Sequence, residues 1–117
     1  MLEILPVENR ETYLEISKAA AEDNHYVLAP THYWKYKDGK IAGYYSNGKI
    51  PVGHFWMSTK ASPRMSYEAI KACEAIGRAS HEMGMIACAE TSPFFPKLES
   101  HFGYKPLLKT TLLWVPM

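Results

Sequence analysis

Two glycine-containing dipeptides constrain the fold of this chain more than any other feature. Asp38-Gly39 and Asn47-Gly48 separate three β-rich runs, and both dipeptides tolerate the positive φ angles of tight hairpin turns. The three runs are residues 33–37, 40–45 and 50–57. Consecutive hairpins of this kind predict an antiparallel meander of three strands.

The segment before the meander predicts a strand and then a helix. Residues 2–7 are compatible with a short strand. Asn9 is a suitable N-cap for a helix that extends to about Asp23. One face of this helix would carry Tyr13, Ile16 and Ala20.

A long helix and a buried strand are predicted after the meander. The helix begins near Ser62-Pro63 or at Ser66, and Gly84 fits the residue just past its end, where a left-handed conformation is needed. Residues 85–89 lack polar alternation, which predicts an interior strand. The apolar face of the helix, with steps of three and four residues, would consist of Met65, Ala69, Cys73, Ile76, Ser80 and Met83.

The last part of the chain predicts one more helix and one more strand. Ser92-Pro93 is typical of a helix start, Gly103 supplies the stop, and residues 107–115 are rich in β-branched and apolar side chains. The element order is then β-α-β-β-β-α-β-α-β. With 117 residues, of which 47% are hydrophobic, we expect a single α/β (α+β) domain over residues 1–117.

Charge and composition exclude several classes of function. The 13 Lys and Arg against 12 Asp and Glu give a formal net charge of +1, so no large field attracts nucleic acid or an anionic membrane. The apolar runs are short, and Glu3 stands where a signal peptide would be basic, which predicts a cytoplasmic protein with no membrane partner. Cys73 and Cys88 lack the spacing of a zinc site and are expected to be buried free thiols.

The order of elements resembles that of the GNAT acetyltransferase superfamily over nearly the whole chain. The sharpest local likeness is residues 92–104, where a polar cap leads to an apolar helix face and to Gly103-Tyr104, with Tyr104 in place of the family's phenylalanine. Residues 55–84 are most similar to short phage-encoded GNAT-like proteins, some of which are virion components. The resemblance implies a mixed central sheet and the transfer of an acetyl group from acetyl-CoA to a small-molecule or protein amine.

The resemblance also implies a coenzyme A site in the loop before the long helix. In typical members, glycines in this loop let backbone N–H groups approach the pyrophosphate. Residues 59–66 contain no glycine, and Pro63 has no N–H to donate. The side chains that would bind phosphate instead are Lys60, Ser62, Arg64 and Ser66. The backbone of Phe55, Trp56 and Met57 would contact the pantetheine arm.

Two side chains are candidate bases for deprotonating the amine. His54 lies on the third strand of the meander and Glu90 at the end of the interior strand, positions that border the acceptor site in the GNAT fold. The alternatives are a half-exposed sheet residue for His54 and a helix-entry carboxylate for Glu90. Glu99 stands where many members carry the tyrosine that protonates the leaving thiolate, so the family's usual acid is missing.

The remaining candidates concern metals and surfaces. The five histidines do not pair at ligand spacing, so no metal site is predicted. Three interpretations of the aromatic and basic meander remain open, namely stacking of single-stranded bases, a protein interface and plain sheet packing, although the near-neutral charge argues against nucleic acid. The residues concerned are Tyr33, Trp34, Tyr36, Tyr44 and Tyr45 with Lys35, Lys37, Lys40 and Lys49.

A non-catalytic interpretation competes with the enzymatic one. In it, the chain is a GNAT-fold interaction protein of phage origin that has lost cofactor binding. After Gly103 the chain has room for one strand, whereas typical members have two. The resulting open sheet edge predicts a homodimer or another protein partner.

Overall fold

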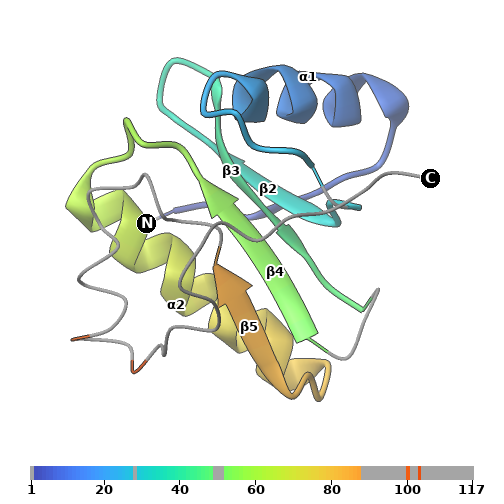
Figure 1. Ribbon diagram of the computed structural model, residues 1–117, viewed down its shortest axis with the longest axis vertical. Coiled ribbons are helices and arrows are strands. Elements are labelled where there is room, and N and C mark those ends of the chain that lie inside the picture. The colour runs from blue at the N-terminus through green and yellow to red at the C-terminus, as the bar shows by residue number, and fades with distance from the viewer. Residues whose placement is uncertain (1, 28, 49–51, 88–99, 101–102, 104–117) are drawn as a thin grey trace.

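One mixed five-stranded sheet with a helix on each face organises the chain (Figure 1). It is seen in a computed structural model that describes residues 2–27, 29–48, 52–87, 100 and 103. The strand order is β1-β2-β3-β4-β5; β4 and β5 are parallel and every other neighbouring pair is antiparallel. The elements are β1 (Leu5–Pro6), α1 (Arg10–Ala21), β2 (His32–Lys35), β3 (Ile41–Ser46), β4 (Val52–Met57), α2 (Pro63–Ala79) and β5 (Gly84–Ala87).

The predicted antiparallel meander is confirmed as strands β2, β3 and β4. Gly39 has a φ of 90° and Gly48 a φ of 77°, the left-handed conformations that their dipeptides predict. In the first turn the Asp38 carboxylate also accepts a hydrogen bond from the Lys40 N–H at 2.9 Å. Local turn chemistry therefore sets the first hairpin.

Helix α1 begins as predicted, because the Asn9 side chain accepts a hydrogen bond from the Thr12 N–H at 2.9 Å. The helix ends at Ala21, two residues before the predicted end. Ile16 and Ala20 are buried against the sheet, but Tyr13, which was expected on the same face, is 39% exposed.

Helix α2 begins at Pro63, and the Ser62 side chain caps it by accepting from the Met65 N–H at 3.1 Å. The prediction that Gly84 ends the helix is wrong. The helix ends at Ala79, and His81 adopts the left-handed conformation with a φ of 59°. The N–H groups of His81 and Glu82 donate to the carbonyls of Arg78 and Gly77, which is the Schellman arrangement.

The residues after this helix end are also placed differently from the prediction. Gly84 is the first residue of β5, so that strand begins one residue earlier than expected. Met83 was assigned to the apolar face of the helix, but it lies beyond the last turn and is 86% exposed.

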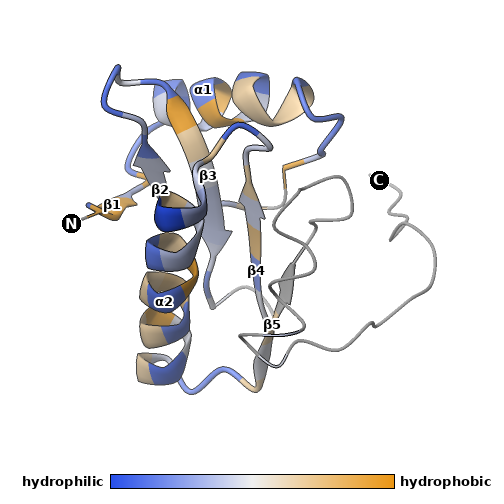
Figure 2. Ribbon diagram, turned by 90° about the vertical axis from the view of Figure 1, so that its left-hand side faces the viewer, coloured by the Kyte–Doolittle hydropathy of each residue, from blue (hydrophilic) through white to orange (hydrophobic). Residues whose placement is uncertain are grey.

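Each helix buries a separate hydrophobic core against its own face of the sheet, because successive strand residues point to opposite faces. In Figure 2, α2 runs along one side of the sheet and α1 crosses its upper end. The core under α2 contains Trp34, Ala42, Tyr45, Phe55, Met57, Ala69, Ile70 and Cys73. The core under α1 contains Ile16, Ala20, Val27, Ile41, Tyr44 and Trp56.

These cores show that three of the aromatic residues of the meander are not surface residues, whereas Tyr33 and Tyr36 are only partly buried. Trp34, Tyr44 and Tyr45 are 0% exposed, so they pack the sheet and form neither a base-stacking surface nor a protein interface. The Cys73 thiol is buried and free, as expected, whereas Cys88 lies outside the described residues.

The predicted helix from Ser92, the predicted strand over residues 107–115 and the sheet edge next to that strand lie outside the described residues. Gly103 is described and has the left-handed φ of 71° expected of a helix stop. Neither α1 nor α2 has the length and apolarity needed to span a membrane.

Candidate functional site

A polar cluster lies within the core under α1 and comes from three segments. His25 follows α1, Tyr44 is on β3 and His54 is on β4. His25 Nε2 is 2.7 Å from the Tyr44 hydroxyl oxygen, and that oxygen is 3.4 Å from His54 Nδ1. Tyr44 is 0% and His54 4% exposed, which corrects the half-exposed alternative for His54, and His25 is half-buried.

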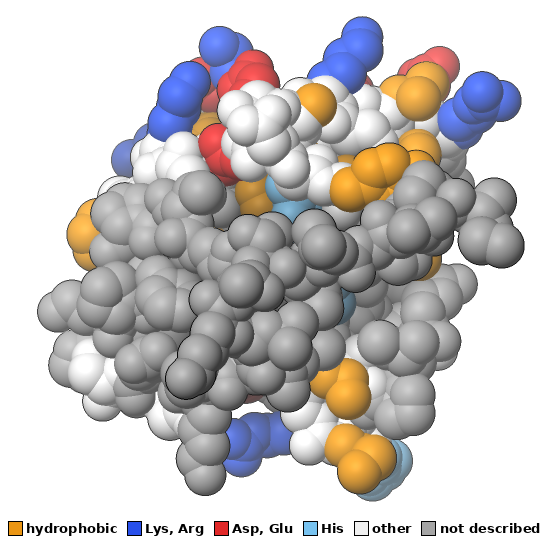
Figure 3. Space-filling view, viewed as in Figure 1, with side chains coloured by type: hydrophobic (Ala, Val, Ile, Leu, Met, Phe, Trp, Pro, Cys, Tyr) orange, Lys and Arg blue, Asp and Glu red, His pale blue; other side chains and the backbone are white. Residues whose placement is uncertain are grey.

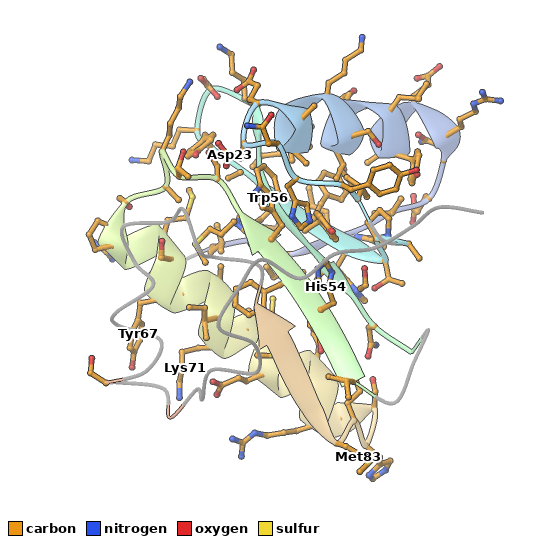
Figure 4. All side chains as sticks on the ribbon, viewed as in Figure 1. Asp23, His54, Trp56, Tyr67, Lys71 and Met83 are labelled. Carbon is orange, nitrogen blue, oxygen red and sulfur yellow. The ribbon has the colours of Figure 1, made fainter. Side chains whose placement is uncertain are left out.

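Aromatic stacking holds the same side chains in place. The ring of His25 is 5.6 Å from that of His54 at an interplanar angle of 12°, and 5.8 Å from the Trp56 ring at 19°. His54 and Trp56 are two residues apart on β4 and therefore point to the same face, as Figure 4 shows. The imidazole of His25 is thus oriented by a hydrogen bond and by two ring contacts.

Burial determines the protonation of the two histidines. Desolvation lowers the pKa of His25 to about 4, and the nearby Asp23 carboxylate opposes this shift in part. Desolvation also lowers the pKa of His54 to about 4, and the charge of His25 acts in the same direction. Both imidazoles are therefore neutral at pH 7, the form that accepts a proton.

Sequence reasoning singled out His54 but missed His25. The two residues are far apart in sequence, and no ligand spacing or strand alternation relates them. The sequence could have identified Tyr44 and Trp56 as neighbours of His54, because a hairpin between residues 40–45 and 50–57 brings these side chains close to it. The placement of His25 depends on how the segment after α1 crosses the sheet.

The opposite face of β3 holds a second polar contact. The Tyr45 hydroxyl donates to Glu82 Oε1 at 2.6 Å. Gly53 and Gly77 make room for it, since a Cβ atom at Gly77 would lie 2.9 Å from the Tyr45 hydroxyl oxygen and one at Gly53 would collide with it. Burial raises the pKa of the neighbouring Cys73 thiol, which is therefore a poor nucleophile.

The loop between β4 and α2 contains the four residues predicted to bind phosphate. The side chains of Lys60 and Arg64 are 80% and 87% exposed. Lys60 lies 4.0 Å from Glu22, and Arg64 lies 3.6 Å from Glu68. The Ser62 hydroxyl serves as the helix cap, and Ser66 is 2% exposed. Ser62 is exposed as well, but its hydroxyl already caps the helix, so the two basic side chains are the members best placed to bind phosphate.

The backbone amides of Thr59, Lys60 and Ala61 in this loop already have acceptors within the protein. Thr59 donates to Asp23 from its N–H at 3.0 Å and from its hydroxyl at 3.1 Å. The N–H groups of Lys60 and Ala61 donate to the side chain and the carbonyl of Ser58. A carboxylate from the end of α1 thus occupies donors that a diphosphate would otherwise use.

Replacing Asp23 by alanine is expected to lower the free energy of unfolding by about 1.5–3 kcal/mol, the usual range for a single hydrogen bond to a charged acceptor, because the two bonds that it removes share one part-buried carboxylate. Urea denaturation measures this effect. Glu22→Ala is the matched control, since the neighbouring Glu22 forms only an exposed pair with Lys60, and it should change stability by less than about 1 kcal/mol. Equal losses in the two variants would contradict the assignment of Asp23 as the link between α1 and the loop.

The predicted pantetheine contacts lie on β4. Phe55 and Met57 are buried under α2 and Trp56 under α1. Within the described residues, Phe55 is paired with Ala87 of β5. The other predicted base, Glu90, lies outside the described residues.

Charge and metal ligands do not define a further site in the described part of the chain. In Figure 3, most of the visible Lys and Arg side chains lie along the upper edge among Asp and Glu side chains, with a further basic group at the lower edge. Among residues 2–27, 29–48 and 52–87, no group of three or more His, Cys, Asp or Glu side chains could hold a metal ion.

Comparison of the chain with protein-family models, with curated proteins and with solved structures finds no match.

Proposed function

We propose that the chain is an acyl-CoA-dependent N-acyltransferase that transfers an acetyl group to an amine. The observation that carries this proposal is the parallel pair β4 and β5, joined through α2 at the side of an otherwise antiparallel sheet. The carboxyl ends of both strands point toward the end of the sheet where α2 begins (Figure 1). Open sheets bind ligands at such ends, next to helix N-termini.

The resemblance to the GNAT superfamily supports the same proposal. A meander followed by a helix and a parallel strand is compatible with that fold, and the pantetheine arm would contact the backbone of Phe55, Trp56 and Met57 on β4. Because the amides of Thr59, Lys60 and Ala61 are occupied, phosphate binding would rely on the side chains of Lys60 and Arg64. The proposal includes a cytoplasmic location, where Cys73 would remain reduced.

His54 is the proposed base. An ammonium acceptor must lose a proton before its nitrogen attacks the thioester carbonyl carbon, and the C–S bond then breaks to release the thiolate of coenzyme A. His54 is neutral at pH 7 and lies on β4, the strand proposed to carry the thioester. The ring contact with His25 and the hydrogen bond to Tyr44 hold its imidazole in one orientation.

Calorimetric titration with acetyl-CoA tests this function. We expect saturable binding that weakens when Lys60 and Arg64 are both replaced by alanine, by about 1.5–3 kcal/mol for each charge-assisted hydrogen bond to phosphate that the substitutions remove. The matched control replaces Lys71 and Arg78, two exposed basic residues farther along α2, and should leave the affinity unchanged. Equal affinity of the Lys60/Arg64 variant and the wild type would exclude this loop as the phosphate site.

One observation favours a second candidate function, a non-catalytic interaction protein with the same fold. The donors of the loop are already bound by Asp23 and Ser58, as expected of a scaffold that no longer holds a cofactor. The resemblance to phage-encoded GNAT-like proteins supports this second candidate function. Absence of any acetyl-CoA binding at millimolar concentration would favour it over the transferase.

A further inference from the structure

We propose that His54, Tyr44 and His25 form a proton relay in which His25 passes to solvent the proton that His54 takes up. The inference rests on the proposed function for the source of the proton, but the relay is a property of the three side chains. In this relay, His25 is the residue that releases the proton to water.

The hydroxyl of Tyr44 lies between one nitrogen of each imidazole, at 2.7 Å from His25 Nε2 and 3.4 Å from His54 Nδ1. A hydroxyl can donate to one of these nitrogens while it accepts from the other. The longer distance is at the edge of hydrogen bonding and must shorten during transfer, as hydrogen bonds of unliganded sites commonly do.

Burial gives the relay a direction. Tyr44 and His54 are 0% and 4% exposed, whereas His25 is half-buried. Among the described residues, His25 is therefore the member of the cluster with access to water. The Tyr44 hydroxyl and His25 connect His54 to the side of the cluster that reaches water, so they offer a route to solvent for a proton that His54 takes up.

The transfer balances without any further reactant. A proton binds Nε2 of His54, and the proton on Nδ1 moves to the Tyr44 oxygen. The hydroxyl proton of Tyr44 moves to Nε2 of His25, and the proton on Nδ1 of His25 leaves to water. Tyr44 ends as a neutral hydroxyl, both imidazoles end as neutral rings with exchanged tautomers, and one proton has crossed the cluster.

Two charge effects act on the cluster. The Asp23 carboxylate, from the segment after α1, stabilises the protonated form of His25. A proton on His25 disfavours one on His54, so the two histidines do not hold protons together easily. The buried residues that α1 contributes here, Ile16 and Ala20, are uncharged, and β4 adds the neutral ring of Trp56.

The rate at which the ring N–H of His54 exchanges with water, measured by ¹⁵N NMR, tests the relay without requiring activity. In the wild type we expect rapid exchange despite burial. Tyr44→Phe and His25→Gln should each slow exchange by about 10-fold or more, because the hydroxyl or the imidazole that carries the proton is gone. Tyr45→Phe is the matched control, since it removes a buried hydroxyl on the other face of the same strand.

The sign of the effect separates the relay from a structural role. Looser packing in Tyr44→Phe or His25→Gln would admit water and speed exchange, whereas loss of the relay slows it. Unchanged or faster exchange in folded Tyr44→Phe and His25→Gln proteins, verified by their amide spectra, would overturn the proposal. Slowed exchange in a protein that fails to bind acetyl-CoA would support the relay and reject the transferase.

Discussion

Replacing Trp34 by alanine is expected to lower the free energy of unfolding by about 3–5 kcal/mol, the usual cost of removing a large buried aromatic side chain. Trp34 is 0% exposed and belongs to the core between the sheet and α2. Its indole covers Gly43 on the neighbouring strand so closely that a Cβ at Gly43 would collide with the ring and lie 2.6 Å from the Trp56 carbonyl oxygen. Removing the indole would therefore leave a cavity over Gly43, which has no side chain to fill it.

Urea denaturation followed by circular dichroism measures the loss. Met83→Ala is the control, because Met83 is also a large apolar residue but is 86% exposed, and its replacement should change stability by less than about 0.5 kcal/mol. A loss below about 1 kcal/mol for Trp34→Ala would contradict the packing role and indicate that Trp34 is exposed.

Acidification is expected to destabilise the protein between about pH 6.5 and pH 4. The pKa values of His25 and His54 fall to about 4 in the folded protein, whereas the ordinary value is 6.5. Below pH 6.5 the unfolded chain binds protons that the folded chain does not, so stability decreases until the pH reaches the folded pKa. Each pKa unit corresponds to about 1.4 kcal/mol, which gives a loss on the order of 3 kcal/mol for His54 and less for the partly exposed His25.

Urea midpoints measured from pH 7.5 to pH 4.5 test this expectation. His54→Asn should lower stability at neutral pH and reduce the slope of stability against pH, because one of the titrating groups is removed. His32, whose pKa is also lowered by burial, should preserve part of the slope. The control is His81→Asn, since His81 is exposed and asparagine tolerates its left-handed conformation, and a full slope retained in His54→Asn would contradict the assignment.

Much of the fold was predictable because its determinants are local. The two dipeptides with glycine place the turns of the meander, and Asn9 and Ser62 cap the two helices with their own side chains. The end of α2 was not predictable in the same way. His81 rather than Gly84 takes the left-handed conformation, because Glu82 turns back over the helix and bonds Tyr45 in the core.

The same distinction between local and tertiary determinants applies to the candidate site. The resemblance to the GNAT superfamily pointed to His54 on the last strand of the meander and to Lys60 and Arg64 before the long helix, because it indicates which strand and which loop would border the site. Only the tertiary structure decided that His54 is buried, that His25 and Tyr44 join it, and that Asp23 accepts both hydrogen bonds from Thr59. These contacts link segments distant in sequence, and the burial and neighbouring charges that set a pKa arise only when the helices pack on the sheet.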